Sequence, residues 1–156
     1  PMTPMRKAIV PTAQRQAATW RYRLEKPADD WFRPDFDDSG WQQGPSGFGT
    51  EGTPGATVRT KWDSGDIWLR RSITLPDCKK EQLVLLVHHD EDVEVYLNGA
   101  LAAKAEGFTT DYEELGISAD ALKAIEPGKP VLVAVHCKQT RGGQYIDLGL
   151  AVVAEP

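Results

Sequence analysis

Hydrophobic and polar positions alternate with a two-residue period in several short stretches of this chain. Apolar residues occupy most odd-numbered positions in 67–75 and 93–97, and residues 83–87 form a continuous apolar run. Such alternation is typical of β-strands that cover one face of a core. An Asn-Gly pair at 98–99 then favours a tight turn into a returning strand over 100–105. With no helix expected between these strands, the pattern predicts an antiparallel sheet.

Comparable signals lie on either side of this region. Alternation over residues 20–24 predicts an earlier strand, and residues 131–136 and 144–153 predict two strands that a turn at 140–143 joins as a hairpin. Ser118 suits the N-cap of a short helix over 118–125, because its hydroxyl can accept a bond from an unpaired N–H of the first turn. We therefore expect an all-β antiparallel sandwich with one short helix.

Two segments lack any regular period. Residues 1–18 are mixed and polar, so we expect a lead-in that packs late or stays loose, ahead of a single domain over 19–156. Residues 31–49 are too rich in Pro, Gly and Asp for regular structure, yet they carry five aromatic side chains. We expect these rings to anchor a long loop, with Trp31 and Trp41 in the core.

Length and composition fit one β-sandwich. The chain has 156 residues, 40% of them hydrophobic, and its 14 glycines and 11 prolines are spread among short apolar runs. A net charge of -5 argues against a nucleic-acid partner, which needs clustered Lys and Arg. No apolar run approaches the roughly 20 residues of a membrane span, so membrane insertion is not expected, and no signal peptide is recognisable. Cys78 and Cys137 are interpreted as two thiols or one disulfide.

Four motifs follow one another in a specific order. They are Asp37-Asp38-Ser39-Gly40-Trp41, Ile67-Trp68-Leu69-Arg70-Arg71, Glu94-Val95-Tyr96-Leu97-Asn98-Gly99 and the segment from Gly128 to His136. In this order they resemble the jelly-roll sugar-binding domain beside the catalytic barrel of family 2 glycoside hydrolases, part of the galactose-binding-domain-like group. Pro130 departs from the pattern, because that family usually has Asn there. The resemblance covers residues 20–153 and implies a jelly-roll sandwich.

The resemblance also implies a function. It points to a non-catalytic carbohydrate-binding accessory module of a larger secreted or periplasmic glycoside hydrolase, with carbohydrate and the parent's catalytic domain as partners. A structural docking module that binds no glycan is the alternative. The residues show no nucleophile with its base at a recognisable spacing, so an independent enzyme is not expected. Loop carboxylates at 35–38 and 90–92 are interpreted mainly as turn formers.

Metal binding is considered at two places. His88-His89-Asp90 contains metal-ligand residue types, but adjacent strand residues point to opposite faces, so structural histidines are expected. A jelly roll can also hold one structural calcium through Asp, Glu and backbone carbonyl oxygens. The candidate calcium ligands are Asp37, Asp38, Asp90 and Asp92. No cofactor is required by this interpretation.

A ligand site is expected at one end of the sandwich. Sugar binding needs an aromatic ring against the pyranose and polar groups for its hydroxyls. Trp62 is the candidate ring, because it lies in a glycine-rich connection where exposure is easy to arrange. If strands alternate up and down, the connections before residue 67 and at 90–92, 109–110 and 139–144 meet. The predicted ligand-binding residues are Lys61, Trp62, Asp63, His89, Asp90, Gln139, Arg141, Gln144 and Tyr145, and a solvated loop end without a ligand is the alternative.

Overall fold

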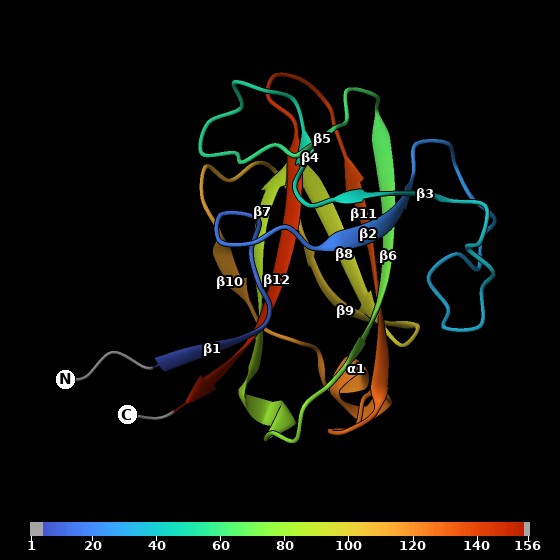
Figure 1. The fold of residues 1–156 in the computed structure, drawn as a ribbon, viewed down its shortest axis with the longest axis vertical. Coiled ribbons are helices and arrows are strands. Elements are labelled where there is room, and N and C mark those ends of the chain that lie inside the picture. Colours follow the sequence, from blue (N-terminus) through green and yellow to red (C-terminus); the bar gives the residue numbers. More distant parts are fainter. Residues whose placement is uncertain (1–4, 155–156) are drawn as a thin grey trace.

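The computed structural model describes residues 5–154 as two β-sheets packed face to face (Figure 1). Sheet A contains β1 (Met5–Val10), β4 (Phe48–Gly49), β5 (Thr60–Lys61), β7 (Leu83–Asp90), β10 (Glu113–Leu115) and β12 (Tyr145–Ala154). Its strand order is β10-β7-β12-β4-β5, and β1 pairs with the C-terminal half of β12. Its strand pairs are antiparallel except β4 with β5.

Sheet B is antiparallel throughout. It contains β2 (Thr19–Arg23), β3 (Gln42–Pro45), β6 (Asp66–Thr74), β8 (Asp92–Leu97), β9 (Ala100–Ala105) and β11 (Pro130–Lys138), in the order β3-β2-β6-β11-β8-β9. The helical elements are η1, a 3₁₀ turn (Lys80–Gln82), and α1 (Ala119–Ala124). The predicted all-β sandwich with one short helix is confirmed, although η1 lies where no helix was expected.

Alternating side chains place the core between the two sheets. On β8, Val93, Val95 and Leu97 are buried, whereas Glu94 and Tyr96 on the opposite face are partly exposed. Burial of a Val or Leu side chain stabilises a fold by about 1.5 to 3 kcal/mol, so this alternation fixes which face of the strand turns inward. The outer face of sheet B is thereby left with its polar and aromatic side chains.

Local turn and cap signals in the sequence are confirmed. Asn98 and Gly99 both have positive φ, 48° and 86°, as the tight turn between β8 and β9 requires. The Ser118 hydroxyl accepts a hydrogen bond from the Ala121 N–H at 3.1 Å and caps α1. Cys78 and Cys137 are two free thiols, which decides between the two interpretations of the cysteines.

The predicted hairpin of the last two strands is wrong. β11 pairs with β6 and β8 in sheet B, whereas β12 pairs with β7 in sheet A. The connection at 139–144 therefore crosses from one sheet to the other. A short turn between two alternating strands is compatible with both arrangements, and only the packing of distant strands selects the crossover.

The lead-in also differs from the expectation. Residues 5–10 form β1, which pairs with β12 from Met5 opposite Ala154 to Val10 opposite Leu150. Beyond β1, the Ala13 N–H donates to the Asp147 carboxylate at 2.7 Å, and both residues are buried. The sequence shows no strand period here, because Arg6, Lys7 and Ala8 are all exposed at the sheet edge and so do not alternate between apolar and polar.

Arg70 fixes the aromatic loop on the outer face of sheet B. Its guanidinium is 2% exposed and donates to the carbonyls of Trp31, Arg33 and Phe36 at 2.5 to 3.1 Å. It also binds the Asp38 carboxylate at 2.8 Å. Trp31 and Trp41 are buried with Trp68, as predicted, in a second hydrophobic cluster outside the main core. The aromatic loop therefore covers part of the outer face of sheet B, and polar side chains occupy the rest of that face.

Candidate functional site

The loops predicted to meet at one end of the sandwich do meet there (Figure 1). The Arg141 N–H donates to the Glu91 carboxylate at 3.0 Å, the Gln139 N–H donates to the Gly65 carbonyl at 2.8 Å, and the Thr109 N–H donates to the His89 carbonyl at 2.7 Å. These contacts join connections from both sheets. The up-and-down argument therefore located the convergence correctly.

The predicted exposed ring at this end is wrong. Trp62 is fully buried in the main core, and its indole N–H donates to the Asp66 carbonyl at 3.1 Å. Lys61 and Asp63 on either side are exposed and form an ion pair with each other at 3.3 Å. Because the strand period continues past β5, Lys61 points outward and Trp62 points into the core.

Most of the other predicted ligand-binding side chains are also buried. His89, Asp90, Gln144 and Tyr145 are at most 6% exposed, while Arg141 is exposed. The Tyr145 hydroxyl donates to the Thr57 carbonyl at 2.8 Å, and the Gln144 amide donates to the Ser64 carbonyl. These residues tie loops together. These buried residues form neither an open ligand site nor the solvated loop end that was the alternative.

Asp90 is the titratable exception among these buried residues. Burial, and then the neighbouring Glu91 carboxylate, raise the pKa of Asp90 to about 6. Its carboxylate lies close to the backbone of Gly143, where a Cβ atom would stand 2.9 Å from Oδ2. Near neutral pH the Asp90 carboxylate is therefore charged in a buried site, and this charge destabilises the folded state.

Three of the four predicted calcium ligands are used in separate contacts, and the fourth, Asp90, is buried away from them. Asp38 pairs with Arg70 and Arg21, Asp37 accepts the Ser39 N–H at 3.0 Å, and Asp92 accepts the Gly107 N–H at 2.8 Å. Within residues 5–154, no three His, Cys, Asp or Glu side chains form a group that could hold a metal ion. The geometry of the described residues therefore gives the calcium prediction no support.

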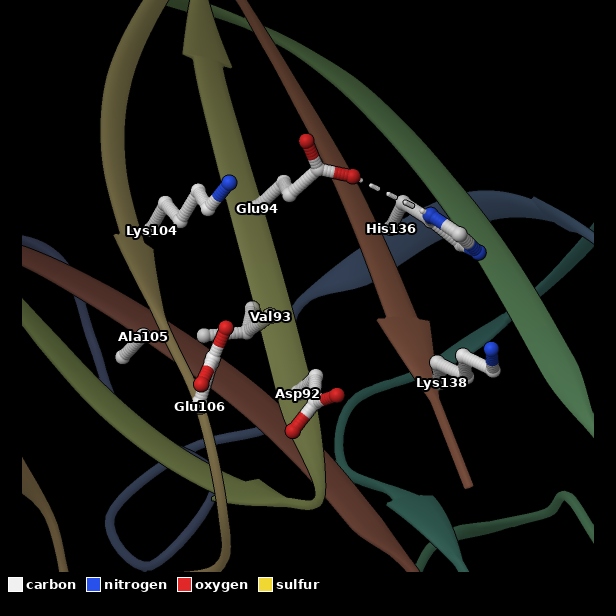
Figure 2. Close-up of a pocket in the computed structure, with 8 residues that line it drawn as sticks. All are labelled: Asp92, Val93, Glu94, Lys104, Ala105, Glu106, His136 and Lys138. Atoms are coloured by element: carbon white, nitrogen blue, oxygen red, sulfur yellow. Dashed lines mark hydrogen bonds and ion pairs between the residues drawn. The ribbon is translucent and has the colours of Figure 1, made fainter. Parts of the chain in front are cut away.

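A polar hollow of about 220 Å³ lies on the outer face of sheet B, over β8, β9 and β11 (Figure 2). It is lined by Asp92, Val93, Glu94, Lys104, Ala105, Glu106, His136 and Lys138. Strand register explains the gathering, because Trp68, His136, Glu94 and Lys104 are neighbours in one row across four strands. Each strand contributes every second residue to this face.

His136 is at the centre of that row. Its ring stacks on Trp68, with centroids 4.8 Å apart and an interplanar angle of 2°. Nε2 lies 2.7 Å from Asp66 Oδ1, and Nδ1 lies 3.4 Å from Glu94 Oε1. The second Glu94 oxygen accepts the Tyr96 hydroxyl at 3.3 Å. The side chain of His136 is 22% exposed, so this network borders solvent.

Phe108 is an exposed aromatic residue in the loop that follows the hollow-lining residue Glu106. Its ring is 67% exposed, and it follows Glu106, which lines the hollow, by two residues. The Gly107 N–H donates to Asp92. His89 Nδ1 lies 2.6 Å from the Glu91 carbonyl and 3.0 Å from the Gly107 carbonyl, so its N–H is shared between them. On the other side, the Thr109 N–H is bonded to His89. The backbone is therefore fixed on both sides of an exposed ring.

Sequence reasoning missed both parts of this candidate site. Phe108 was given no role, although a lone Phe between Gly107 and two threonines in a polar loop is a signal of exposure. His136 and Glu94 were placed on strands, but only the register of β8 against β11 brings them together. Of the predicted residues, His89 takes part indirectly by supporting the Phe108 loop.

No helix in residues 5–154 is long and apolar enough to cross a membrane. Among the residues whose burial is described, Leu101 and Phe108 are the large hydrophobic side chains that are exposed. The docking module that is the alternative function would present an apolar patch of several hundred Å². Two exposed side chains give that expectation little support.

The known proteins that this chain resembles are glycoside hydrolases. No protein-family model matches the chain. An α-L-rhamnosidase from Streptomyces avermitilis is 29% identical over 133 residues, which is 75% of this chain and 12% of the rhamnosidase. A solved calcium-binding mutant of Bacteroides uniformis β-glucuronidase 2 aligns over 97% of this chain and 18% of its own, with a TM-score of 0.65 and 20% identity.

A family 2 glycosyl hydrolase from Bacteroides cellulosilyticus aligns over 93% of this chain and 20% of its own, with a TM-score of 0.61 and 16% identity. The fold is that of a domain found in family 2 glycoside hydrolases. This confirms the resemblance that the ordered motifs predicted. The chain spans less than a third of each enzyme it matches here, so it corresponds to a small part of large glycoside hydrolases.

Proposed function

We propose that this chain is a non-catalytic module of a glycoside hydrolase and that it binds carbohydrate at the hollow of sheet B. The observation that carries the proposal is the exposed Phe108 side chain, two residues after Glu106, which lines that hollow, on a loop whose backbone is hydrogen-bonded. An apolar ring and a few fixed polar groups are the two parts from which pyranose sites are built. Glu94, His136 and the two lysines supply the polar part.

The proposal includes a partner and a location. The catalytic domain of the parent hydrolase is the protein partner, because the chain matches a small share of whole glycoside hydrolases. We also propose secretion or periplasmic export, and the support is the similarity to bacterial glycoside hydrolases. The docking alternative keeps the partner and omits the glycan.

The experiment is a glycan array with the 156-residue chain, run with calcium and again with chelator. We include glycans that end in α-L-rhamnose and in glucuronic acid, because the relatives are named for these sugars. A specific signal, followed by a saturable calorimetric titration, supports the proposal. Folded protein that binds no glycan on the array overturns it in favour of docking.

Two matched variants locate the site. Phe108→Ala removes the exposed ring and is expected to weaken glycan binding by about ten-fold, the loss of a stacking contact worth about 1.4 kcal/mol. Leu101→Ala removes the other exposed large hydrophobic side chain among the residues whose burial is described. Leu101 lies on β9 opposite Tyr96, outside the loop that follows Glu106, so the change is expected to leave affinity within about two-fold. Equal losses in both variants contradict this placement.

A further inference from the structure

A second hollow lies on the outer face of sheet A, on the opposite side of the sandwich from the hollow of sheet B. This sheet A hollow has a volume of about 380 Å³, which falls within the range of about 300 to 1,000 Å³ that is typical of small-molecule sites. It is lined by Ala8 on β1, Leu86 on β7 and Ala151 on β12. Because Leu86 alternates with Leu85 and Val87 of the main core, its side chain faces away from sheet B. These three residues form an apolar floor.

One buried carboxylate holds both walls of the sheet A hollow. The first wall is the segment 12–15, and the second is Tyr112. Asp147 is 1% exposed, and it accepts the Ala13 N–H of the first wall at 2.7 Å and the Tyr112 hydroxyl at 2.5 Å. A Cβ atom at Gly149 would stand 3.0 Å from a side chain of the segment 12–15, so glycine lets this wall lie against the sheet. The walls are therefore fixed before a ligand arrives, which lowers the entropy cost of binding.

The charges around the sheet A hollow cancel. Arg6 closes one end by donating from Nε and Nη2 to the Glu114 carboxylate at 3.1 and 2.6 Å. Arg15 and Asp111 also line the hollow, and both are exposed. Within residues 5–154, neither of these two takes part in an ion pair. The hollow thus offers one charged donor and one charged acceptor to a ligand, without a net charge that would select an ionic one.

The floor disfavours a peptide and suits a sugar. β12 pairs with β1 and β7, and β7 also pairs with β10, so the backbone groups of these strands are used within sheet A. An extended peptide binds a sheet mainly through unpaired backbone groups at a free edge. A pyranose instead has an apolar C–H face and hydroxyls around its ring. Those features match an apolar floor that is surrounded by polar side chains.

We propose that the sheet A hollow is a second carbohydrate site, which takes one neutral pyranose of a glycan. This inference goes beyond the proposed function, because it concerns the opposite face of the sandwich and different residues. The floor contacts the C–H face of the sugar, while Arg15 donates to its hydroxyls and Asp111 accepts from them. With sites on opposite faces, one module holds two separate glycan chains, which strengthens its attachment to a dense polysaccharide.

The test is an amide chemical-shift titration of the ¹⁵N-labelled 156-residue chain. The probes are the methyl glycosides of glucose, galactose, mannose and rhamnose, all neutral pyranoses. Each is added to about 50 mM, which fills about nine-tenths of a site whose Kd is about 5 mM. At least one probe is expected to cause saturable shifts in residues 8–15 and 111–114, the two sides of the sheet A hollow.

Three variants place the site, and affinity is read from the shifts of residues 111–114. Arg15→Ala should weaken binding about five-fold, the loss of a hydrogen bond worth about 1 kcal/mol. Ala8→Phe should abolish it, because the ring fills the floor, and Ala8 is exposed, so no core side chain is displaced. Lys7→Ser is the matched control. Lys7 is exposed and lies between Arg6 and Ala8, so it points to the other face of β1, and affinity should stay within about two-fold.

The outcomes separate this site from the one proposed on sheet B. Absence of saturable shifts in residues 8–15 and 111–114 overturns the inference, even where residues 92–94 and 104–108 respond or the array retains a glycan. Unchanged affinity in both Arg15→Ala and Ala8→Phe also overturns it. An array signal that survives Phe108→Ala and is lost in Ala8→Phe supports the inference and overturns the placement on sheet B.

Discussion

At the scale of single residues, Arg70 holds the aromatic loop on the outer face of sheet B. Three backbone carbonyls and one carboxylate converge on one buried guanidinium. The planar fork of Arg satisfies several acceptors at fixed angles, which the single ammonium of Lys cannot do. The Ile-Trp-Leu-Arg-Arg motif identified the strand, but the carbonyls that Arg70 binds belong to a loop more than 30 residues away.

Arg70→Lys is expected to lower the free energy of unfolding by about 2 to 4 kcal/mol, because buried carbonyls lose their donors while the buried charge keeps only part of its pairing. Urea denaturation followed by tryptophan fluorescence measures it. The matched control is Arg71→Lys on the next residue, whose Nη1 has no hydrogen-bond partner. That change should cost less than about 1 kcal/mol, and similar losses in both variants would contradict the role of Arg70.

Asp90 gives a pH-dependent prediction. Its pKa is raised to about 6 in the folded protein, above the 3.8 of a free Asp. The folded state therefore holds the proton more tightly, so the contribution is present below about pH 4 and is lost as pH rises to about 6. Asp90→Asn removes this loss. The variant should match the wild type near pH 4 and exceed its stability by up to about 3 kcal/mol near pH 7.

Chemical denaturation of wild type and Asp90→Asn at intervals of one pH unit checks this. The difference in free energy of unfolding should open between about pH 4 and pH 6 and then stay constant, which follows the titration of one group. Asp92→Asn serves as control, because Asp92 is less buried and its carboxylate already accepts the Gly107 N–H. Parallel pH curves for wild type and Asp90→Asn would rule out the assignment.

At the scale of elements, the turn between β8 and β9 was predictable, but its tertiary role was not. The Asn98 amide donates to the Ala124 carbonyl at 2.9 Å, and its Oδ1 accepts the Leu132 N–H at 2.8 Å. The side chain therefore joins the turn to the end of α1 and to β11. The Asn-Gly pair indicates positive φ, and nothing local in the sequence indicates these two bonds.

A pair of variants separates the turn from the bonds. Asn98→Gly keeps a residue that accepts positive φ and loses both side-chain bonds, so it should cost about 1 to 3 kcal/mol of stability. Asn98→Ala loses the same bonds and adds the strain of a left-handed Ala, so it should cost about 1 kcal/mol more. Thermal unfolding gives both values. A stability of Asn98→Gly equal to wild type would show that the bonds contribute nothing.

Strand positions could be predicted from the sequence because side-chain alternation is a local property. The partners β8 and β9 could also be predicted, because the Asn-Gly turn joins them. The other strand partners could not, because their pairing depends on the whole sandwich, as the crossover from β11 to β12 shows. The same limit governs the candidate site. Trp62 was predicted to be exposed because its sequence neighbours are rich in glycine, but it is buried. The row that places His136 beside Glu94 exists only in the assembled sheet.

At the scale of the whole molecule, the N-terminal segment belongs to the fold. β1 lies beside β12 in sheet A (Figure 1), and Val10 is 2% exposed within the main core. Three residues further on, the Ala13 N–H binds the buried Asp147 carboxylate, and the Ala13 carbonyl accepts from Arg59 at 2.7 Å. Burial raises the pKa of Asp147, so this carboxylate depends on its donors, which are Ala13 and the Tyr112 hydroxyl at 2.5 Å.

Deletion of residues 1–13 is therefore expected to destabilise the whole domain. It removes a strand, the two buried side chains of Val10 and Ala13, and one donor to a buried carboxylate, a combined loss of about 3 kcal/mol or more. For a domain of this size that corresponds to a fall in Tm of roughly 10 °C. Calorimetry should still show one transition, because β12 continues to pair with β7. The control is Lys7→Ser, an exposed change in β1, which should leave Tm unchanged. An unchanged Tm after the deletion would mean that residues 1–13 are a loose lead-in that does not stabilise the domain.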